Sequence, residues 1–392
     1  MDAGDTSGSL QKTLTLQDLI FFGVATIIGS GGFNLVGEAV LAGGNQWPLP
    51  FALASVILLG SSRTFEEAFD SFKTNTAASD FVGKIFGERV SYLTIGSILI
   101  WDILSIATIL VLCTHMLFPG ASWVSQISFA LLLLALMGYF SLKGLDVDKH
   151  IINTFSGVLI VLLGSLSLAG LGSASVEGIP AIPKLPLQSF ALSTLFFYFI
   201  LAGFDALINF TEETKDEKDI PRSFYLSNLL SIVLVLGLCL AFIVFVDMKN
   251  IKYYDDSIGN IFGAFFGKQG KFIGTYFSVI YMIITTFVTF LATTRYIYGL
   301  GEKYKALDFI TMLNQAKVPI NSIGVTLAAS AAAILVNHTE TLVRVADFGL
   351  SSLLFMVAGA ATRSVVLQGK IPWIEAPTAV GLLGMLGLSF MK

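Results

Sequence analysis

The sequence has few charged residues and few of the side chains that bind metals or form disulfides. Only 13% of its 392 residues are charged, against about 25% in soluble domains. Two cysteines in apolar runs and three widely separated histidines exclude a disulfide framework and a zinc cluster. No basic, aromatic-interleaved tract indicates a nucleic-acid partner. With 55% hydrophobic residues and a mean hydropathy of +0.80, the chain is predicted to lie in a lipid bilayer.

Apolar residues gather in eleven segments, each near the length of about 20 residues that spans a bilayer as a helix. They cover residues 16–43, 48–69, 91–117, 122–142, 151–172, 187–211, 223–246, 271–300, 318–337, 345–367 and 372–390. The segments lack strand-like alternation, and within lipid only helices and closed barrels satisfy the backbone. We therefore predict an all-α integral membrane protein with about 11 transmembrane helices.

The distribution of basic residues predicts the orientation. If the N-terminus is cytoplasmic, fifteen of the 23 lysines and arginines lie on the inner side and seven on the outer side, as expected for cytoplasmic loops. The first 15 residues are polar, so no cleaved signal peptide is predicted. Residues 70–90 are amphipathic and predict an interfacial helix on the inner side. Residues 247–270 predict an outer loop.

Two of the predicted spans contain helix-weakening residues at their centres. Gly29 to Gly32 are four small residues in the first span, and the sixth span has Gly203 followed by Asp205. Glycine favours unwinding, although small residues also allow close helix packing. A membrane-buried carboxylate indicates a functional site, although it can also satisfy a helix end. Breaks in the first and sixth spans have the spacing of a five-plus-five inverted repeat.

Three segments together resemble the amino acid–polyamine–organocation (APC) superfamily, especially its cationic amino acid transporter branch. GSGGFNLVGEA, from Gly29, is similar to the first-span motif of that family. AGFDALINFTEETKDEKDIPRS, from Ala202, resembles its G-F-D … E-E … I-P signature, and ATTRYIYGL, from Ala292, its eighth-span arginine motif. The loop after Glu213 lacks the usual Asn-Pro, which indicates a divergent relative.

This resemblance implies a leucine-transporter-type fold with two inverted five-helix repeats and discontinuous first and sixth helices. We expect a cytoplasmic tail over residues 1–15, a ten-helix core over 16–367 and an additional helix over 368–392. The two repeats would cover about 16–172 and 187–367.

The resemblance also places a substrate between the two breaks. The backbone of Ser30, Gly31 and Gly32 would receive a carboxylate. The carbonyl of Ile28 and those near Phe199 and Ala202 would receive an amine, and Phe204 would serve as a gate. The complete predicted substrate site consists of Ile28, Gly29, Ser30, Gly31, Gly32, Phe199, Ala202, Gly203, Phe204, Asp205 and Asp102.

A second group of residues is predicted to bind a coupling ion or proton. It consists of Thr293, Thr294, Asp102 and Glu38. The fifth span has no lysine, unlike proton-coupled family members, so Na⁺ coupling or uncoupled transport is expected beside H⁺ coupling. Arg295 is expected to pair with an acidic residue such as Asp205 or Glu212.

The sequence thus predicts secondary transport or exchange of amino acids, with cationic ones included, by alternating access. A polyamine transporter and a non-transporting sensor of the same fold remain alternatives. No enzyme is expected: His115 lies thirteen residues from Asp102, about 20 Å along a helix, so the two cannot form a dyad. The expected partners are a small-molecule substrate and the lipid bilayer, with no cofactor other than Na⁺ or H⁺.

Overall fold

The computed structural model describes residues 10–172, 185–246, 256–336 and 338–389, and these residues form helices and connecting segments with two isolated β-bridges. The helices of the first half are α1 (Leu16–Ile27), α2 (Ser30–Asn34), α3 (Val36–Gly43), η1 (Gly44–Gln46), α4 (Pro48–Ser71), α5 (Ala77–Phe86), α6 (Glu88–Leu117), α7 (Trp123–Ser141) and α8 (Leu145–Gly172). Those of the second half are α9 (Leu187–Leu201), η3 (Phe204–Glu213), α10 (Asp219–Phe245), α11 (Ser257–Lys303), η5 (Lys305–Thr311), α12 (Ile320–Val336), α13 (Thr339–Leu367) and α14 (Glu375–Ser389).

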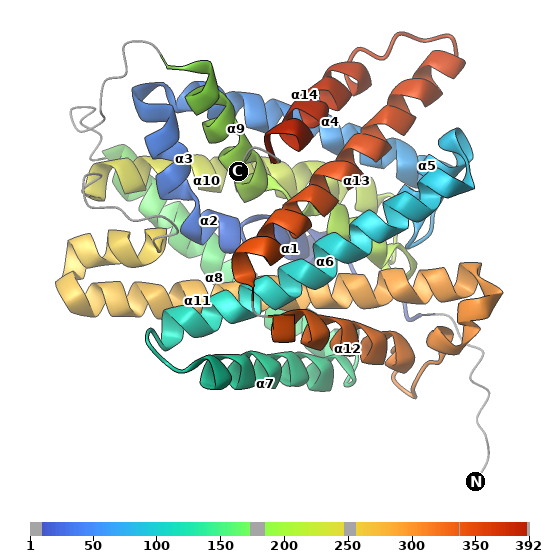
Figure 1. Ribbon diagram of the computed structural model, residues 1–392, viewed down its shortest axis with the longest axis horizontal. Helices are drawn as coiled ribbons and strands as arrows, with labels where there is room; N and C mark the ends of the chain where they lie inside the picture. The colour runs from blue at the N-terminus through green and yellow to red at the C-terminus, as the bar shows by residue number, and fades with distance from the viewer. Residues whose placement is uncertain (1–9, 173–184, 247–255, 337, 390–392) are drawn as a thin grey trace.

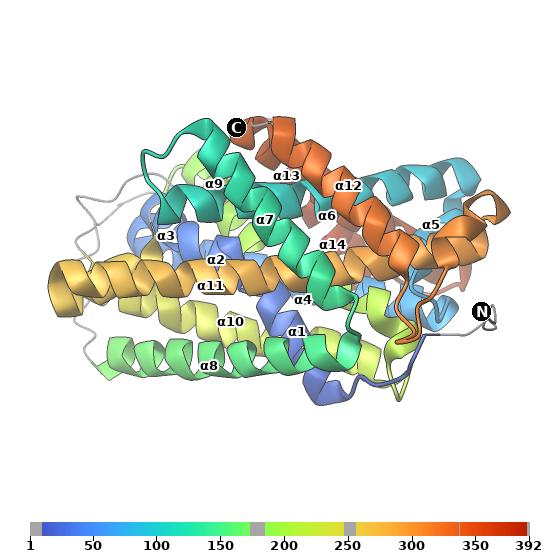
Figure 2. The ribbon, with the colours of Figure 1, turned by 90° about the horizontal axis from the view of Figure 1, so that it is seen from below.

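The long helices enclose the broken ones (Figure 1). Helices α8, α10 and α11 run side by side along one flank, while α6 and α13 cross on another (Figures 1 and 2). The short helices α1 and α2 lie between these layers, packed against α9, α10 and α11. Among the described residues, eight helices are long and apolar enough to cross a membrane. The all-helical membrane architecture predicted from the sequence is therefore confirmed.

All eleven predicted segments contain helix, but the predicted loop at 247–270 is wrong for its described part. Helix begins at Ser257, where the carboxylate of Asp256 accepts the amide of Gly259 and the hydroxyl of Ser278. The chain then folds back at Gly267, whose φ of 62° lies in the left-handed region that favours glycine. Residues 247–255 lie outside the described residues.

The polar stretch 70–90 contains a shorter helix than predicted. Helix α5 covers Ala77–Phe86 and buries one apolar face against α6, α13 and α4. Gly87, with φ of 95°, ends it, and α6 begins at once at Glu88. The segment is thus a helix–turn that leads directly into a long helix.

The first predicted span is divided into three helices. Helix α1 begins with a capping box, in which Thr15 and Asp18 satisfy each other's backbone amides. It ends at Ile27 because Ile28 and Gly29 leave helical geometry, with ψ of 38° and −139°. The predicted break is confirmed, but it lies at Ile28–Gly29. Ser30, Gly31 and Gly32 are already helical, since α2 begins at Ser30.

The sixth predicted span is broken at Ala202–Gly203. Helix α9 ends at Leu201, and the chain continues from Phe204 as the 3₁₀-helix η3. Gly203 has a φ of 130°, and a Cβ placed on it would lie 2.6 Å from the carbonyl oxygen of Thr26. The second break therefore requires glycine both for its backbone angle and for its contact with the first broken helix.

Candidate substrate site

A cavity of about 140 Å³ lies where the two breaks meet. This volume exceeds by roughly tenfold the 10–15 Å³ that one water molecule needs. Five elements line it: the break between α1 and α2, the break between α9 and η3, and helices α6, α11 and α13. The cavity lies beside the half of α6 that is farther from Glu88, because the α6 residues that line it run from Trp101 to Leu112.

The wall of the cavity is acidic and rich in hydroxyl groups. Asp102 lines it from α6 and Asp347 from α13, and its described lining includes no lysine, arginine or histidine. Asp102 is 4% exposed, and its Oδ2 accepts a hydrogen bond from the hydroxyl of Thr293, 3.1 Å away. Two acidic residues from different helices therefore line one cavity.

Six of the predicted substrate residues line this cavity. They are Gly29, Gly31, Phe199, Ala202, Gly203 and Asp102. The two breaks touch here, because a Cβ on Gly31 would lie 3.0 Å from the Cα of Ile200 and 3.3 Å from the carbonyl oxygen of Phe199. Ile28 belongs to the first break and Gly32 to the helix that follows it, and neither is among the described lining residues.

Phe204 and Asp205 are directed elsewhere. The ring of Phe204 packs edge-to-face against Phe65 and Phe224, with ring centroids 5.3 and 5.8 Å apart. Neither Phe204 nor Asp205 is part of the cavity lining. Asp205 is 6% exposed, and one of its carboxylate oxygens has no hydrogen-bond partner. In this conformation Phe204 thus belongs to an aromatic cluster behind the break, and the structure does not place it as a gate over the cavity.

The four residues predicted to bind a coupling ion are distributed over three places. Thr293 contacts Asp102 beside the cavity. The hydroxyl of Thr294 instead accepts a hydrogen bond from Nη1 of Arg295. Glu38 is buried in the first turn of α3. The structure therefore does not bring these four side chains together.

The sequence analysis missed several residues that line the cavity. Thr285 and Thr289 line it from α11, and Ser105 and Thr108 from α6. Thr285, Thr289 and Thr293 are spaced by four, and Asp102, Ser105 and Thr108 by three. Side chains at these spacings share one face of a helix, so two polar stripes in apolar spans would have identified them. Thr285 also links the helices, since its hydroxyl donates to the carbonyl of Ala25 at 2.7 Å.

The face of the protein on which the N-terminal segment lies, called the N-terminal face below, is closed by a buried ion pair. Arg295 is 0% exposed, and its Nε and Nη2 donate to the two carboxylate oxygens of Glu213 at 2.9 and 3.2 Å. Arg295 thus pairs with an acidic residue, as predicted, but this residue is Glu213 and neither Asp205 nor Glu212. Glu212 instead exchanges hydrogen bonds with Asn75, through its own backbone amide and its carboxylate.

The N-terminal segment lies across the end of η3. The amides of Thr13 and Leu14 both donate to the backbone carbonyl of Glu213, at 2.9 and 3.0 Å, and the amide of Lys215 donates to the carbonyl of Leu14. Leu10 packs beside them against Tyr298 and Leu313. The first broken helix is thereby attached to the second on this face.

Ion pairs between loops add to this closure. Lys73 donates to Glu217 at 2.9 Å, and this hydrogen bond holds the pKa of Glu217 below its usual value. Lys303 at the end of α11 pairs with Asp80 of α5. Taken together, these contacts join η3, α5, α11 and the N-terminal segment on the N-terminal face.

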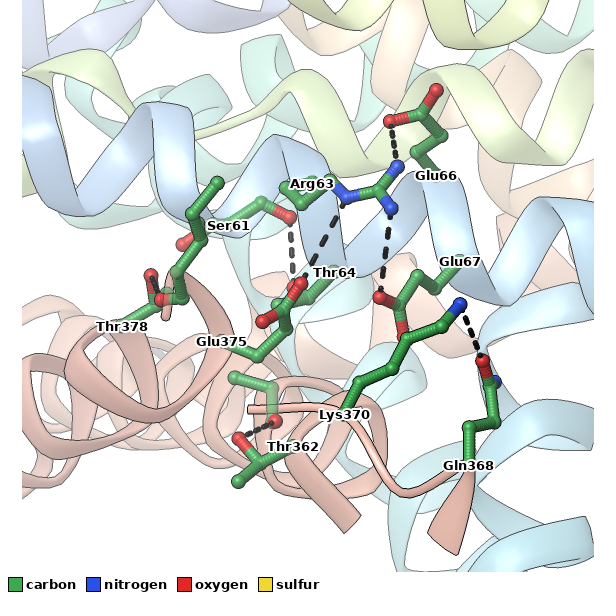
Figure 3. Close-up of polar contacts among 12 residues, drawn as sticks. Ser61, Arg63, Thr64, Glu66, Glu67, Thr362, Gln368, Lys370, Glu375 and Thr378 are labelled. Atoms are coloured by element: carbon green, nitrogen blue, oxygen red, sulfur yellow. Dashed lines mark hydrogen bonds and ion pairs between the residues drawn. The ribbon is translucent and has the colours of Figure 1, made fainter. Parts of the chain in front are cut away.

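A second arginine cluster lies between α4 and α14 (Figure 3). Arg63 contacts Glu66 at 2.7 Å, Glu67 at 3.9 Å and Glu375 at 3.8 Å. Here, unlike at Arg295, the guanidinium is part-exposed, with 39% of the side chain accessible.

Across the described residues, no group of three or more His, Cys, Asp or Glu side chains is arranged to hold a metal ion.

Comparisons with known proteins confirm the predicted family resemblance. No family model matches the sequence. The chain is 23% identical over 381 residues to cationic amino acid transporter 1 of Arabidopsis thaliana, covering 91% of this chain and 63% of that protein. It is 24% identical over 310 residues to the low-affinity putrescine importer PlaP of Escherichia coli, covering 75% and 67%. The branched-chain amino acid permease BcaP of Bacillus subtilis is 25% identical over 256 residues, covering 58% and 54%. These relatives are transporters rather than enzymes.

The fold is similar to that of a solved transporter. The crystal structure of MhsT in complex with L-phenylalanine matches with a TM-score of 0.63 over 98% of both chains, at 12% sequence identity. The leucine-transporter-type architecture that the family resemblance implied is thus confirmed as the fold of this chain. The chain spans less than two thirds of the length of the Arabidopsis relative.

Proposed function

We propose that this protein is a secondary transporter that moves amino acids across a membrane by alternating access, with the substrate in the cavity between the two breaks. The observation that carries this proposal is the meeting of two interrupted helices at one polar cavity. Broken membrane helices present unpaired amides and carbonyls, and irregular backbone in a bilayer is tolerated where it lines a cavity.

The two breaks supply opposite partners for a zwitterion. The amides near Gly29 and Gly31 follow a helix end and are available to a carboxylate. The last carbonyls of α9, near Phe199, have no following turn of α-helix to bond and are available to an ammonium group. The α-amino and α-carboxylate groups of an amino acid would therefore bind without any charged side chain.

The acidic wall favours a substrate with a further positive charge. Asp102 and Asp347 line the same cavity from different helices, with no cationic lining residue among those described. A basic side chain directed toward them would bind in a site of low dielectric, where opposite charges attract more strongly than in water. We propose a cationic amino acid as the preferred substrate. The same two carboxylates suit a diamine, so a polyamine is the second candidate.

The contacts on the N-terminal face indicate a conformation that is closed toward that face. The path to the N-terminal face is blocked by Arg295, Glu213 and the segment around Leu14. We place that face in the cytoplasm because the lysine- and arginine-rich loops meet there, with Lys143 and Lys317 lining a small cavity beside Thr13. Transport would then require these contacts to open.

The proposal is tested by uptake of labelled lysine, leucine and putrescine into proteoliposomes containing the full chain. We expect saturable lysine uptake that Asp347→Asn weakens by roughly tenfold, equal to about 1.4 kcal/mol, while leucine uptake changes less. Glu340→Gln, at an exposed position in the first turn of α13, is the matched control and should leave uptake unchanged.

Other outcomes would select an alternative. Uptake of putrescine but no amino acid would favour the polyamine importer. Binding of lysine without any uptake would favour a sensor of the same fold. If Gly31→Val, which would force a branched side chain against the backbone of Ile200, leaves uptake of every substrate intact, the assigned cavity is wrong.

A further inference from the structure

Asp148 in the first turn of α8 is a fully buried acid that no step of the transport proposal uses. Its side chain is 0% exposed, and neither carboxylate oxygen has a hydrogen-bond partner. Its neighbour Asp146 behaves differently, since it is 58% exposed and pairs with Lys149 at 2.6 Å. Two acids two residues apart on one helix therefore have opposite surroundings.

The charged groups that act on Asp148 are Arg295 of α11 and Glu213 of η3. Arg295 is already engaged, because Nε and Nη2 donate to Glu213 and Nη1 donates to Thr294. The buried cluster of Arg295, Glu213 and Asp148 therefore contains one cation and two acids. If both acids were ionised, a negative charge would remain without a partner inside the protein.

The other helices packed on α8 do not supply the missing positive charge. Helix α7 contains no Asp, Glu, Lys, Arg or His. On α1, Asp18 is bonded to Thr15 and Asn153. On α10, Asp219 and Arg222 pair with each other. Lys143 and Lys317 line a cavity of about 110 Å³ that Glu213 also lines, but no hydrogen bond or ion pair joins either lysine to Asp148.

An isolated carboxylate in a buried site is strongly unfavourable, and such groups become neutral instead. We propose that Asp148 is a proton-binding site, occupied while the Arg295–Glu213 pair closes the N-terminal face and emptied when that face opens. On closing, the carboxylate and one proton from water form the carboxylic acid. On opening, the O–H bond breaks and the proton returns to water on the N-terminal face.

If the protein is a transporter, this site would couple each opening of the N-terminal face to the release of one proton. This coupling to transport rests on the proposed function. The binding site itself does not, because its occupancy is measurable without any substrate. Purified full-length protein should lose thermal stability as pH rises from about 4 to about 7, since over this range the folded closed state retains the proton that the unfolded chain has released.

The decisive variant is Asp148→Asn, which keeps the shape and removes the titration. We expect the unfolding midpoint of this variant to decrease much less with rising pH than that of the wild type. At high pH the midpoint of the variant should exceed that of the wild type. Asp146→Asn is the matched control on the same helical turn and should keep the wild-type slope. Equal slopes in the wild type and Asp148→Asn would overturn the proposal.

A second variant, Glu213→Gln, tests the proposal if Asp148→Asn does not fold. In Glu213→Gln, Arg295 is freed to pair with Asp148, which can then ionise, so the same part of the pH slope should disappear. If instead added Na⁺ at constant pH raises the wild-type midpoint and Asp148→Asn removes that rise, the site binds sodium and the proton proposal is wrong. A pH slope that depends on Asp148 together with no uptake of any substrate would keep the proton site and reject the transport function.

Discussion

The two arginine clusters of this protein differ in what surrounds the guanidinium. Arg295 is fully buried and makes a two-pronged contact with one carboxylate. Arg63 is part-exposed and shares three glutamates, only one of them closer than 3.8 Å (Figure 3). The first joins η3 to α11 on the N-terminal face, and the second joins α4 to α14. Both clusters contain ion pairs, yet they should contribute very differently to the free energy of unfolding.

The difference lies in desolvation. A buried pair gains little over an apolar pair of the same shape, but removing one partner leaves an uncompensated charge and costs about 3–5 kcal/mol. A part-exposed pair is screened by water and is worth about 0–1 kcal/mol. The Arg295 pair is thus a contact that must be either intact or fully opened to water, which suits a gate. The Arg63 cluster can rearrange at small cost.

The largest expected effect is that of Arg295→Met. This change leaves Glu213 without its partner in a buried site and should lower the free energy of unfolding by about 3–5 kcal/mol. Arg63→Met, the matched control, should cost about 1 kcal/mol or less. Denaturation of the two purified variants followed by tryptophan fluorescence measures both. Equal losses would show that burial does not distinguish the two clusters.

An intermediate effect is expected from Thr294→Val. The variant removes the hydroxyl that accepts Nη1 of Arg295 at 3.0 Å and leaves a buried charged donor unpaired, at a cost of about 1–3 kcal/mol. Thr362→Val is the control, because the Thr362 hydroxyl donates only to the carbonyl of Ala358 on its own helix. The same denaturation experiment should rank Thr294→Val well above the control, and an inverted ranking would refute the assigned role of Thr294.

The smallest effect is expected from Glu375→Gln, which weakens one long contact of Arg63. Its cost should stay below about 1 kcal/mol, because the contact is 3.8 Å long and the Arg63 side chain is part-exposed although Glu375 is buried. The cost should shrink as salt rises from about 0.1 M to about 1 M, because salt reaches the part-exposed guanidinium. The deficit of Arg295→Met should persist over the same range. A salt titration of the unfolding midpoint of both variants provides the measurement. A salt-sensitive Arg295→Met deficit would mean that water reaches the buried pair.

Local sequence signals were sufficient for the membrane helices and for both breaks. Glycine weakens a helix wherever it occurs, and Gly29 and Gly203 both have non-helical backbone angles at the breaks. Asp205 was singled out because a carboxylate in an apolar span is rare, whereas Asp102 was named through the family resemblance. These features depend on few residues and on no distant contact.

The partner of Arg295 could not be predicted because it depends on the winding of η3. A 3₁₀-helix turns about 120° per residue and an α-helix about 100°. Over the nine steps from Phe204 to Glu213, the difference adds to about 180°, which decides whether Glu212 or Glu213 faces α11. Asp148 was missed for a related reason. Its surroundings come from η3 and α11, both more than 50 residues away in sequence.

The contact between the N-terminal segment and η3 has a consequence for mutational scanning. Its three hydrogen bonds, at Thr13, Leu14 and Lys215, join backbone atoms only. Replacing these side chains by alanine leaves every backbone donor and acceptor in place, so a mutational scan would report at Leu14 only the loss of its buried side chain and not the hydrogen bonds. Proline differs, because it lacks the amide hydrogen. Contacts between two segments can therefore be made by backbone atoms that side-chain substitutions leave intact, and only proline tests them directly.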